Sequence, residues 1–166
     1  MSRQCQRVPV RKPSTRRSPR ISCHAYPDCM DPRRTLAFGL SLGFRSAENG
    51  GRQTVLTGGN APEDRFTYRP NWGLPGMTPP EQTAAMVFGF SAAPVVPGQV
   101  VRAVIVVLYP QTVQQWEKQV DIGSRLPMYE GSREVGEGRV LWRSTAALPL
   151  DDQKASEFDS WLTSRP

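Results

Sequence analysis

Four side chains of types that commonly bind zinc lie close together near the N-terminus. Cys5, Cys23, His24 and Cys29 fall within twenty-five residues, and the chain has no other cysteine or histidine. Tetrahedral zinc sites are usually built on pairs of such residues two to four positions apart. No pair of that kind occurs here, and adjacent Cys23 and His24 point to opposite sides of an extended chain. We therefore expect reduced thiols, with no metal and no cofactor.

The residue sets that support enzyme catalysis are also missing from the sequence. His24 is the single histidine, so no catalytic triad is expected. The acidic pairs Glu63-Asp64 and Asp151-Asp152 stand in polar or loop surroundings, which keep carboxylates solvated. No G-x4-G-K-[ST] phosphate loop occurs, so the chain is not expected to bind a nucleotide or hydrolyse GTP. The sequence predicts a protein that binds a partner and is not an enzyme.

The net charge of +6 is concentrated in the first thirty-four residues. They hold nine Lys and Arg and two Asp, whereas residues 35–166 hold twelve Lys and Arg and thirteen Asp and Glu. Residues 1–34 have three interpretations: a disordered basic arm that touches RNA, a targeting peptide, or a wrongly assigned start upstream of Met30. The sequence shows neither the apolar run of a signal peptide nor a membrane span, and predicts a cytoplasmic protein.

Residues 35–145 alternate β-strand patterns with Gly and Pro turns. Residues 36–44 are apolar at every second position, and residues 100–109 form an almost unbroken β-branched run. Further strand patterns lie at residues 54–57, 65–68, 84–90, 126–130 and 134–142. About six strands without crossover helices predict an all-β protein, an antiparallel barrel or sandwich. A helical turn or short helix is expected at 112–120.

Residues 146–166 form a C-terminal tail with a short helix. Ala155, Phe158 and Leu162 share one helical face, and Asp151 or Asp152 can cap the first turn. Such a helix either docks a partner or packs as a lid on the open end of the barrel. We favour the lid.

Five landmarks occur in order between Phe38 and Trp142. They are GGR at 50–52, YRP at 68–70, VPG at 96–98, Pro110, and EGSREVGEG at 130–138. In this order and spacing the region resembles the third, C-terminal β-barrel domain of elongation factor Tu and other translation GTPases. The resemblance covers about two thirds of the chain. It implies a six-stranded antiparallel Greek-key β-barrel with a link to translation.

Several landmark residues also have a purely structural interpretation. Gly131, Gly136 and Gly138 suit places where a closing strand turns sharply and lets another backbone approach closely. We favour a role inside the fold, as hydrogen-bond donors, for the three landmark arginines: Arg52, Arg69 and Arg133.

The resemblance implies contacts with RNA. In the resembled factor this barrel helps to hold the T-stem of aminoacylated tRNA, and it also contacts the nucleotide-exchange factor and the GTPase domain. The matching positions here are Asn71, which replaces the family's glutamine, and Glu130 and Gly131, at a turn that meets a 2′-hydroxyl of the stem. The family's polar stretch is replaced by residues 73–80, so its threonine contact has no equivalent here.

Two functions of different classes are therefore considered. The preferred one is a non-catalytic module that binds a translation-related protein through an apolar patch. The residues predicted for this patch are Trp72, Leu74, Met77 and Trp116. The alternative is a stand-alone barrel that binds tRNA or another RNA stem through Asn71, Glu130 and Gly131. The near-neutral charge of residues 35–166 favours the protein partner, because RNA binding draws much of its affinity from basic side chains.

Overall fold

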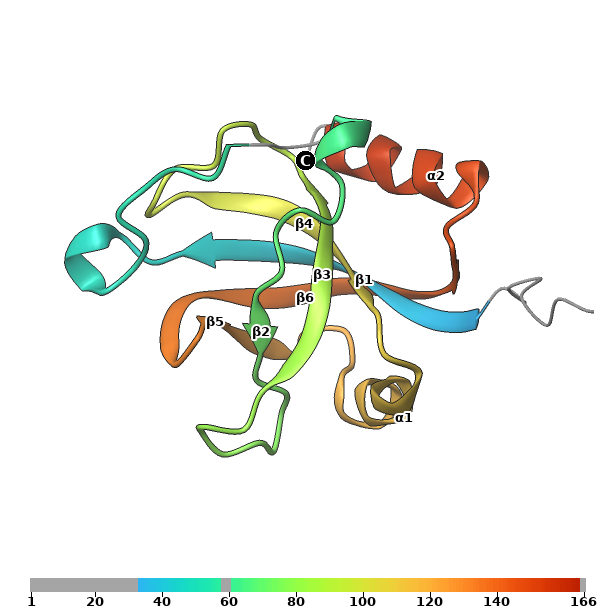
Figure 1. The fold of residues 1–166 in the computed structure, drawn as a ribbon, viewed down its shortest axis with the longest axis horizontal. Helices are drawn as coiled ribbons and strands as arrows, with labels where there is room; N and C mark the ends of the chain where they lie inside the picture. Colours follow the sequence, from blue (N-terminus) through green and yellow to red (C-terminus); the bar gives the residue numbers. More distant parts are fainter. Residues whose placement is uncertain (1–32, 58–60, 165–166) are drawn as a thin grey trace, which may run out of the picture. The chain divides into compact units, whose positions relative to one another are not determined.

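The computed structural model describes residues 33–57 and 61–164. In these residues six strands close into an antiparallel β-barrel in the order β1-β4-β3-β2-β5-β6 (Figure 1). The strands are β1 (Arg33–Phe44), β2 (Asn71–Trp72), β3 (Thr83–Phe90), β4 (Val100–Val107), β5 (Arg125–Glu130) and β6 (Arg133–Leu148). The helices are α1 (Pro110–Gln119) and α2 (Asp152–Thr163), with short 3-10 turns at η2 (Ala47–Asn49) and η3 (Pro62–Asp64). Because β2, β3 and β4 are consecutive neighbours and β1 returns beside β4, the connections are those of a Greek key, and the predicted fold class is confirmed.

The strand β2 differs from the sequence-based expectation. Residues 54–57 and 65–68 do not form strands of the barrel, and Leu56 makes only an isolated bridge with Val95. Instead, Asn71 and Trp72 close the barrel between β3 and β5, outside every stretch predicted to be a strand. Two residues are too few to show an alternating pattern, so this strand has no sequence signal.

The strand β6 is longer than predicted, and this moves the boundary of the barrel. It pairs with β1 from Gly136 opposite Phe44 to Leu148 opposite Arg33. The barrel therefore extends beyond the predicted boundary at residue 145. The sequence misses this extension because residues 143–148 lack strong apolar alternation.

Alternate residues of the strands fill the barrel interior. On β1 these are Leu36, Phe38, Leu40, Leu42 and Phe44, each at most 6% exposed. The helix α1 adds Trp116 to the same core, with its ring 5.3 Å from that of Phe38. Its indole Nε1 donates to the hydroxyl of Thr83 at 3.3 Å. The expected helix at 112–120 is thus confirmed, and it contributes to the interior.

The C-terminal helix α2 packs on the outer wall of the barrel. Its buried residues Ala155, Phe158 and Leu162 form a second core with outward-facing residues of the strands, among them Phe88, whose ring lies 5.3 Å from that of Phe158. Asp151 caps the helix by accepting a hydrogen bond from the backbone N–H of Lys154 at 2.7 Å. The helix, its buried face and its cap are confirmed. The predicted position on the open end is wrong, because outward-facing strand positions supply an apolar surface for it.

Two of the three predicted glycines, Gly131 and Gly136, have the structural roles expected of them, whereas a Cβ at Gly138 would meet the side chain of Leu40 and not another backbone. A Cβ at Gly136 would lie 2.5 Å from the carbonyl oxygen of Gly43 on β1, so only glycine permits this close approach. Gly131 has a φ of 63° at the turn between β5 and β6. Both residues are needed for the hairpin that completes the barrel.

Some predictions concern residues beyond the described part of the chain. The basic segment with its three interpretations falls almost entirely there, as do Cys5, Cys23, His24 and Cys29. Neither described helix has the length and apolar character needed to cross a membrane.

Candidate functional site

A network of polar side chains centres on Glu130, the last residue of β5. Its Oε1 accepts hydrogen bonds from the Tyr68 hydroxyl at 2.9 Å and from Nη1 of Arg52. Its Oε2 lies 3.4 Å from Nη2 of Arg133. The side chains of Arg52 and Glu130 are only 19% and 25% exposed, so solvent screens their attraction weakly. The network fastens the segment after β1 to the β5–β6 hairpin.

Tyr68 is held in its neutral form by this environment. Burial is the main cause that raises its pKa well above the ordinary value of 10.0, and the carboxylate of Glu130 raises the pKa further. The guanidinium of Arg52, which lies 5.6 Å from the centroid of the Tyr68 ring, acts in the opposite direction. Tyr68 therefore acts as a permanent hydrogen-bond donor to Glu130 near neutral pH.

The three landmark arginines donate hydrogen bonds within the fold. Besides its bond to Glu130, Arg52 donates from Nε to the carbonyl oxygen of Thr54 at 3.3 Å. Arg69 donates from Nε to the carbonyl oxygen of Phe66 at 3.1 Å. Arg133 reaches Glu130. These contacts confirm the structural interpretation of the arginines.

The structure places the three predicted RNA contacts at neighbouring positions of the backbone. Asn71 pairs with Tyr129 across β2 and β5, which places it beside the end of β5, where Glu130 and Gly131 follow. The side chain of Asn71 is half-buried, whereas Gly131 is exposed and its carbonyl accepts a hydrogen bond from Gln82 at 3.1 Å. Because the carboxylate of Glu130 already faces three donors, Asn71 and the backbone of Gly131 are the more accessible members of the group.

The predicted apolar partner patch is wrong. Trp72 and Trp116 are 0% exposed and Leu74 is 3% exposed, so they are part of the barrel core. The indole Nε1 of Trp72 donates to the carbonyl oxygen of Ala85 at 3.0 Å. Met77 is half-buried and packs against the same core. Trp72, Leu74 and Met77 lie in a stretch rich in Gly and Pro, for which the sequence predicts exposure. In the structure their side chains pack in or against the barrel core.

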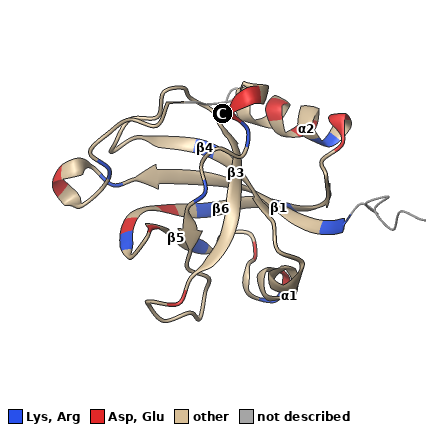
Figure 2. Ribbon diagram, in the orientation of Figure 1, with Lys and Arg blue, Asp and Glu red and all other residues tan. Residues whose placement is uncertain are grey.

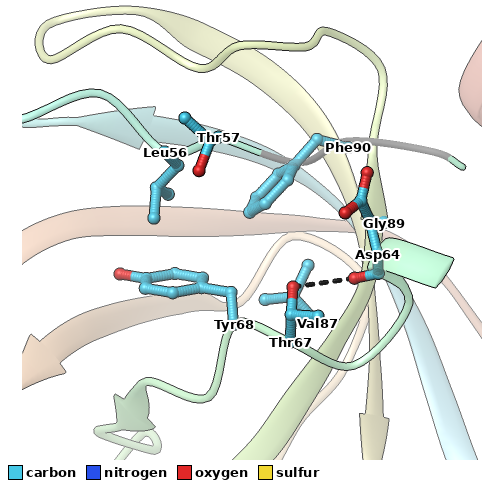
Figure 3. A pocket seen from close by; sticks show the side chains of 8 residues that line it. All are labelled: Leu56, Thr57, Asp64, Thr67, Tyr68, Val87, Gly89 and Phe90. Carbon is cyan, nitrogen blue, oxygen red and sulfur yellow. Dashed lines mark hydrogen bonds between the residues drawn. The ribbon is translucent and has the colours of Figure 1, made fainter.

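A pocket of about 190 Å³ opens beside Tyr68. Its lining residues are Leu56, Thr57, Asp64, Thr67, Tyr68, Val87, Gly89 and Phe90 (Figure 3). The rings of Tyr68 and Phe90 lie 6.0 Å apart and, with Leu56, form much of its apolar wall. The hydroxyl of Thr67 donates to the carbonyl oxygen of Asp64 at 2.8 Å. The pocket has the size of one apolar side chain.

Two exposed valines lie next to this pocket. Val55 and Val96 are 43% and 48% exposed. The antiparallel bridge between Leu56 and Val95 places Val55 opposite Val96, directly beside the pocket residue Leu56. The only sequence signal for Val55 and Val96 is the short apolar run at 54–57, and that run predicts a strand.

The comparisons with known proteins add no relative. No model of a known protein family matches the chain, and no curated protein matches it. No group of three or more His, Cys, Asp and Glu side chains within the described ranges is arranged to hold a metal ion. The function has to be inferred from the landmarks of the sequence and from the geometry of the barrel.

Proposed function

We propose that this chain is a non-catalytic binding module, related to the third domain of elongation factor Tu, that binds a protein of the translation apparatus. The pocket beside Tyr68 carries the proposal. It has room for one apolar side chain of a partner, and exposed Val55 and Val96 lie next in the chain to the Leu56–Val95 bridge at its edge. Hot spots of protein interfaces are side chains that anchor in such pockets and exclude water.

Charge and sequence landmarks support the same function. Residues 35–166 carry nearly equal numbers of positive and negative side chains, so the barrel has no strong general attraction for phosphate. The ordered landmarks resemble those of a translation factor, and this resemblance is the basis for choosing translation proteins as partners. Elongation factor Tu and its nucleotide-exchange factor are the first two candidates to test.

Val96→Asp is expected to weaken binding of the partner at least tenfold. The substitution places a charge on the exposed side of the Leu56–Val95 bridge, where a partner that reaches the pocket would have to desolvate it. Binding of the full chain to purified elongation factor Tu and to the exchange factor is measured by calorimetry. Because Val96 is 48% exposed, the melting temperature is expected to stay close to that of the wild type.

Tyr109→Asp is the matched control. Tyr109 is also 48% exposed, but it follows β4, whereas Val96 precedes that strand. It occupies the N-cap position of α1, where aspartate is well tolerated. Equal affinities of the Val96→Asp and Tyr109→Asp proteins would reject the pocket as the binding site. Failure of both translation factors to bind the wild type would reject the proposed partners.

A stand-alone RNA-binding barrel is the second candidate function. The observation in its favour is the β2–β5 register, which places Asn71 beside the end of β5 and so beside Glu130 and Gly131. The amide of Asn71 and the exposed backbone of Gly131 are suited to the ribose edge of an RNA stem.

Asn71→Ala is expected to weaken tRNA binding about five- to tenfold if this second function is correct, since one amide contact is lost. The full chain is titrated with labelled tRNA at about 150 mM salt, where non-specific attraction is reduced. Gln114→Ala removes an exposed amide on α1 and serves as the control. Equal affinities for the two variants, or binding that does not saturate, would eliminate the RNA function.

A further inference from the structure

The outer face of β5 and β6 holds two arginines directly opposite each other. Arg125 pairs with Arg139 in the ladder of these strands, and the side chain of Arg125 is 74% exposed. In Figure 2 the ribbons of both strands carry positions coloured as Lys or Arg. Arg139 is exposed as well. Like charges directly opposite in an antiparallel pair destabilise it. Natural proteins break such local rules mainly at functional sites.

Arg139 is the arginine of this face that has no hydrogen bond or ion pair with any described residue. Arg125 forms an ion pair with Glu137 at 3.0 Å. Ser41 on β1 pairs with Arg139 on one side and with Arg102 on the other, so Arg102 belongs to the same row. Arg102 is engaged at the end of α2, where it donates to the carbonyl oxygen of Leu162 at 2.9 Å.

For Arg139, by contrast, no hydrogen bond or ion pair is found within the described part of the chain. The carboxylate of Glu137 balances the charge of Arg125, and no carboxylate of a described residue balances that of Arg139. The face therefore carries one excess positive charge. These arginines lie in one row across neighbouring strands, and the guanidinium of Arg139 has no acceptor among the described residues. It is therefore available to bind an anionic group of another molecule.

Two exposed aliphatic side chains flank the arginines. Ile122 is 68% exposed and Leu141 is 42% exposed. The N–H of Gly123 donates to the carbonyl oxygen of Val140 at 2.8 Å, which holds the turn containing Ile122 against β6 beside Leu141. Leu141 itself is the extra residue of the bulge between β1 and β6, since Leu40 pairs with Val140 and Gly39 pairs with Trp142.

We propose that this face, defined by Ile122, Arg125, Arg139 and Leu141, binds an acidic segment of a partner protein that also carries apolar side chains. The guanidinium groups bind the carboxylates, for which arginine has a matching planar geometry. The aliphatic side chains of the partner pack on Ile122 and Leu141. The inference rests on the proposed function in one respect, namely that the partner is a protein.

An RNA backbone fits this face less well. Phosphates would also bind the arginines, but a backbone of phosphate and ribose has no apolar group to cover Ile122 and Leu141. A protein interface combines a central apolar contact with charged and polar groups around it. The combination of charge and apolar surface therefore favours the protein.

The test uses a labelled peptide of alternating Glu and Leu, titrated with the full chain at about 50 and 150 mM salt. Saturable binding is expected, with lower affinity at the higher salt concentration. Arg139→Glu is expected to lower the affinity at least tenfold, and Ile122→Asp several-fold, because they remove the charged and the apolar contact respectively. A peptide of alternating Lys and Leu is expected not to bind the wild type.

Arg33→Glu is the matched control. Arg33 is an exposed arginine at the start of β1, where it pairs with Leu148, and charge reversal there is expected to leave the affinity unchanged. Equal affinity of the wild type and Arg139→Glu proteins for the Glu–Leu peptide would overturn the inference. Loss of tRNA binding in Arg139→Glu, with no binding of the peptide to the wild type, would overturn it in favour of RNA.

The failure of this inference differs from the failure of the proposed function. If Val96→Asp abolishes binding to a translation factor while Arg139→Glu binds the peptide like the wild type, only the present inference is wrong. If neither translation factor binds but the peptide binds in a manner that depends on Arg139, the acidic-segment site stands and the link to translation is withdrawn.

Discussion

Trp72→Ala is expected to lower the free energy of unfolding by about 3–5 kcal/mol, the range for removing a buried aromatic side chain. Trp72 is fully buried and belongs to the two-residue strand that joins β3 to β5. The substitution also leaves the carbonyl oxygen of Ala85 without the indole donor. The loss is measured by urea denaturation, followed by circular dichroism at neutral pH.

Trp161→Ala is the control for this prediction. Trp161 is half-buried on α2, where its ring lies 5.3 Å from that of Trp142 on the outer wall of the barrel. A loss of about 1–2 kcal/mol is expected there, because less apolar surface is withdrawn from water. A small loss for Trp72→Ala, combined with lost partner binding, would contradict the core position of Trp72 and restore it as a contact residue.

Glu130→Ala is expected to lower the free energy of unfolding by about 2–4 kcal/mol, since breaking a shielded hydrogen-bonded ion pair leaves its partners unpaired. The partners affected are the guanidinium of Arg52 and the hydroxyl of Tyr68. Glu130→Gln is expected to cost less, because the amide oxygen still accepts one hydrogen bond. An unchanged stability of Glu130→Ala, together with weaker RNA binding, would instead make Glu130 a ligand contact.

The same network has a signature at alkaline pH. The pKa of Tyr68 is raised in the folded protein, so above about pH 10 the unfolded state releases this proton before the folded state does. The stabilisation is complete below pH 10 and is lost as the pH rises toward the folded-state pKa. The free energy of unfolding is therefore expected to fall as the pH rises above about 10, and Tyr68→Phe is expected to reduce this fall.

The candidate sites differ in how far the sequence reveals them. Asn71, Glu130 and Gly131 could be named in advance because the resemblance to the elongation factor Tu barrel implies them, and each lies within or next to one of its landmarks. The pocket and the Arg125–Arg139 face could not be named, because each depends on which residues lie opposite each other in the ladders. Register is a property of paired strands, and a single strand does not reveal its partner.

The sequence by itself determined the class of the fold and much of its detail. Period-two alternation in β1, the β-branched run of β4 and the helical spacing of α2 are local patterns, and they predict their elements because local burial follows from local periodicity. The turn at Gly131 likewise followed from local chemistry. These features require no knowledge of distant contacts, whereas the Greek-key connection was implied only by the resemblance.

Only the tertiary structure decided that Trp72 and Trp116 belong to the barrel core. Trp72 lies in a strand of two residues, which is too short for a periodic signal, and the i, i+3 spacing of Val113 and Trp116 marks one face of α1 without showing what covers it. Each becomes buried because residues far away in the chain close around it, such as Phe38 against Trp116 and Ala85 against Trp72. Burial of an isolated aromatic residue depends on long-range closure of the barrel, and local sequence contains no record of that closure.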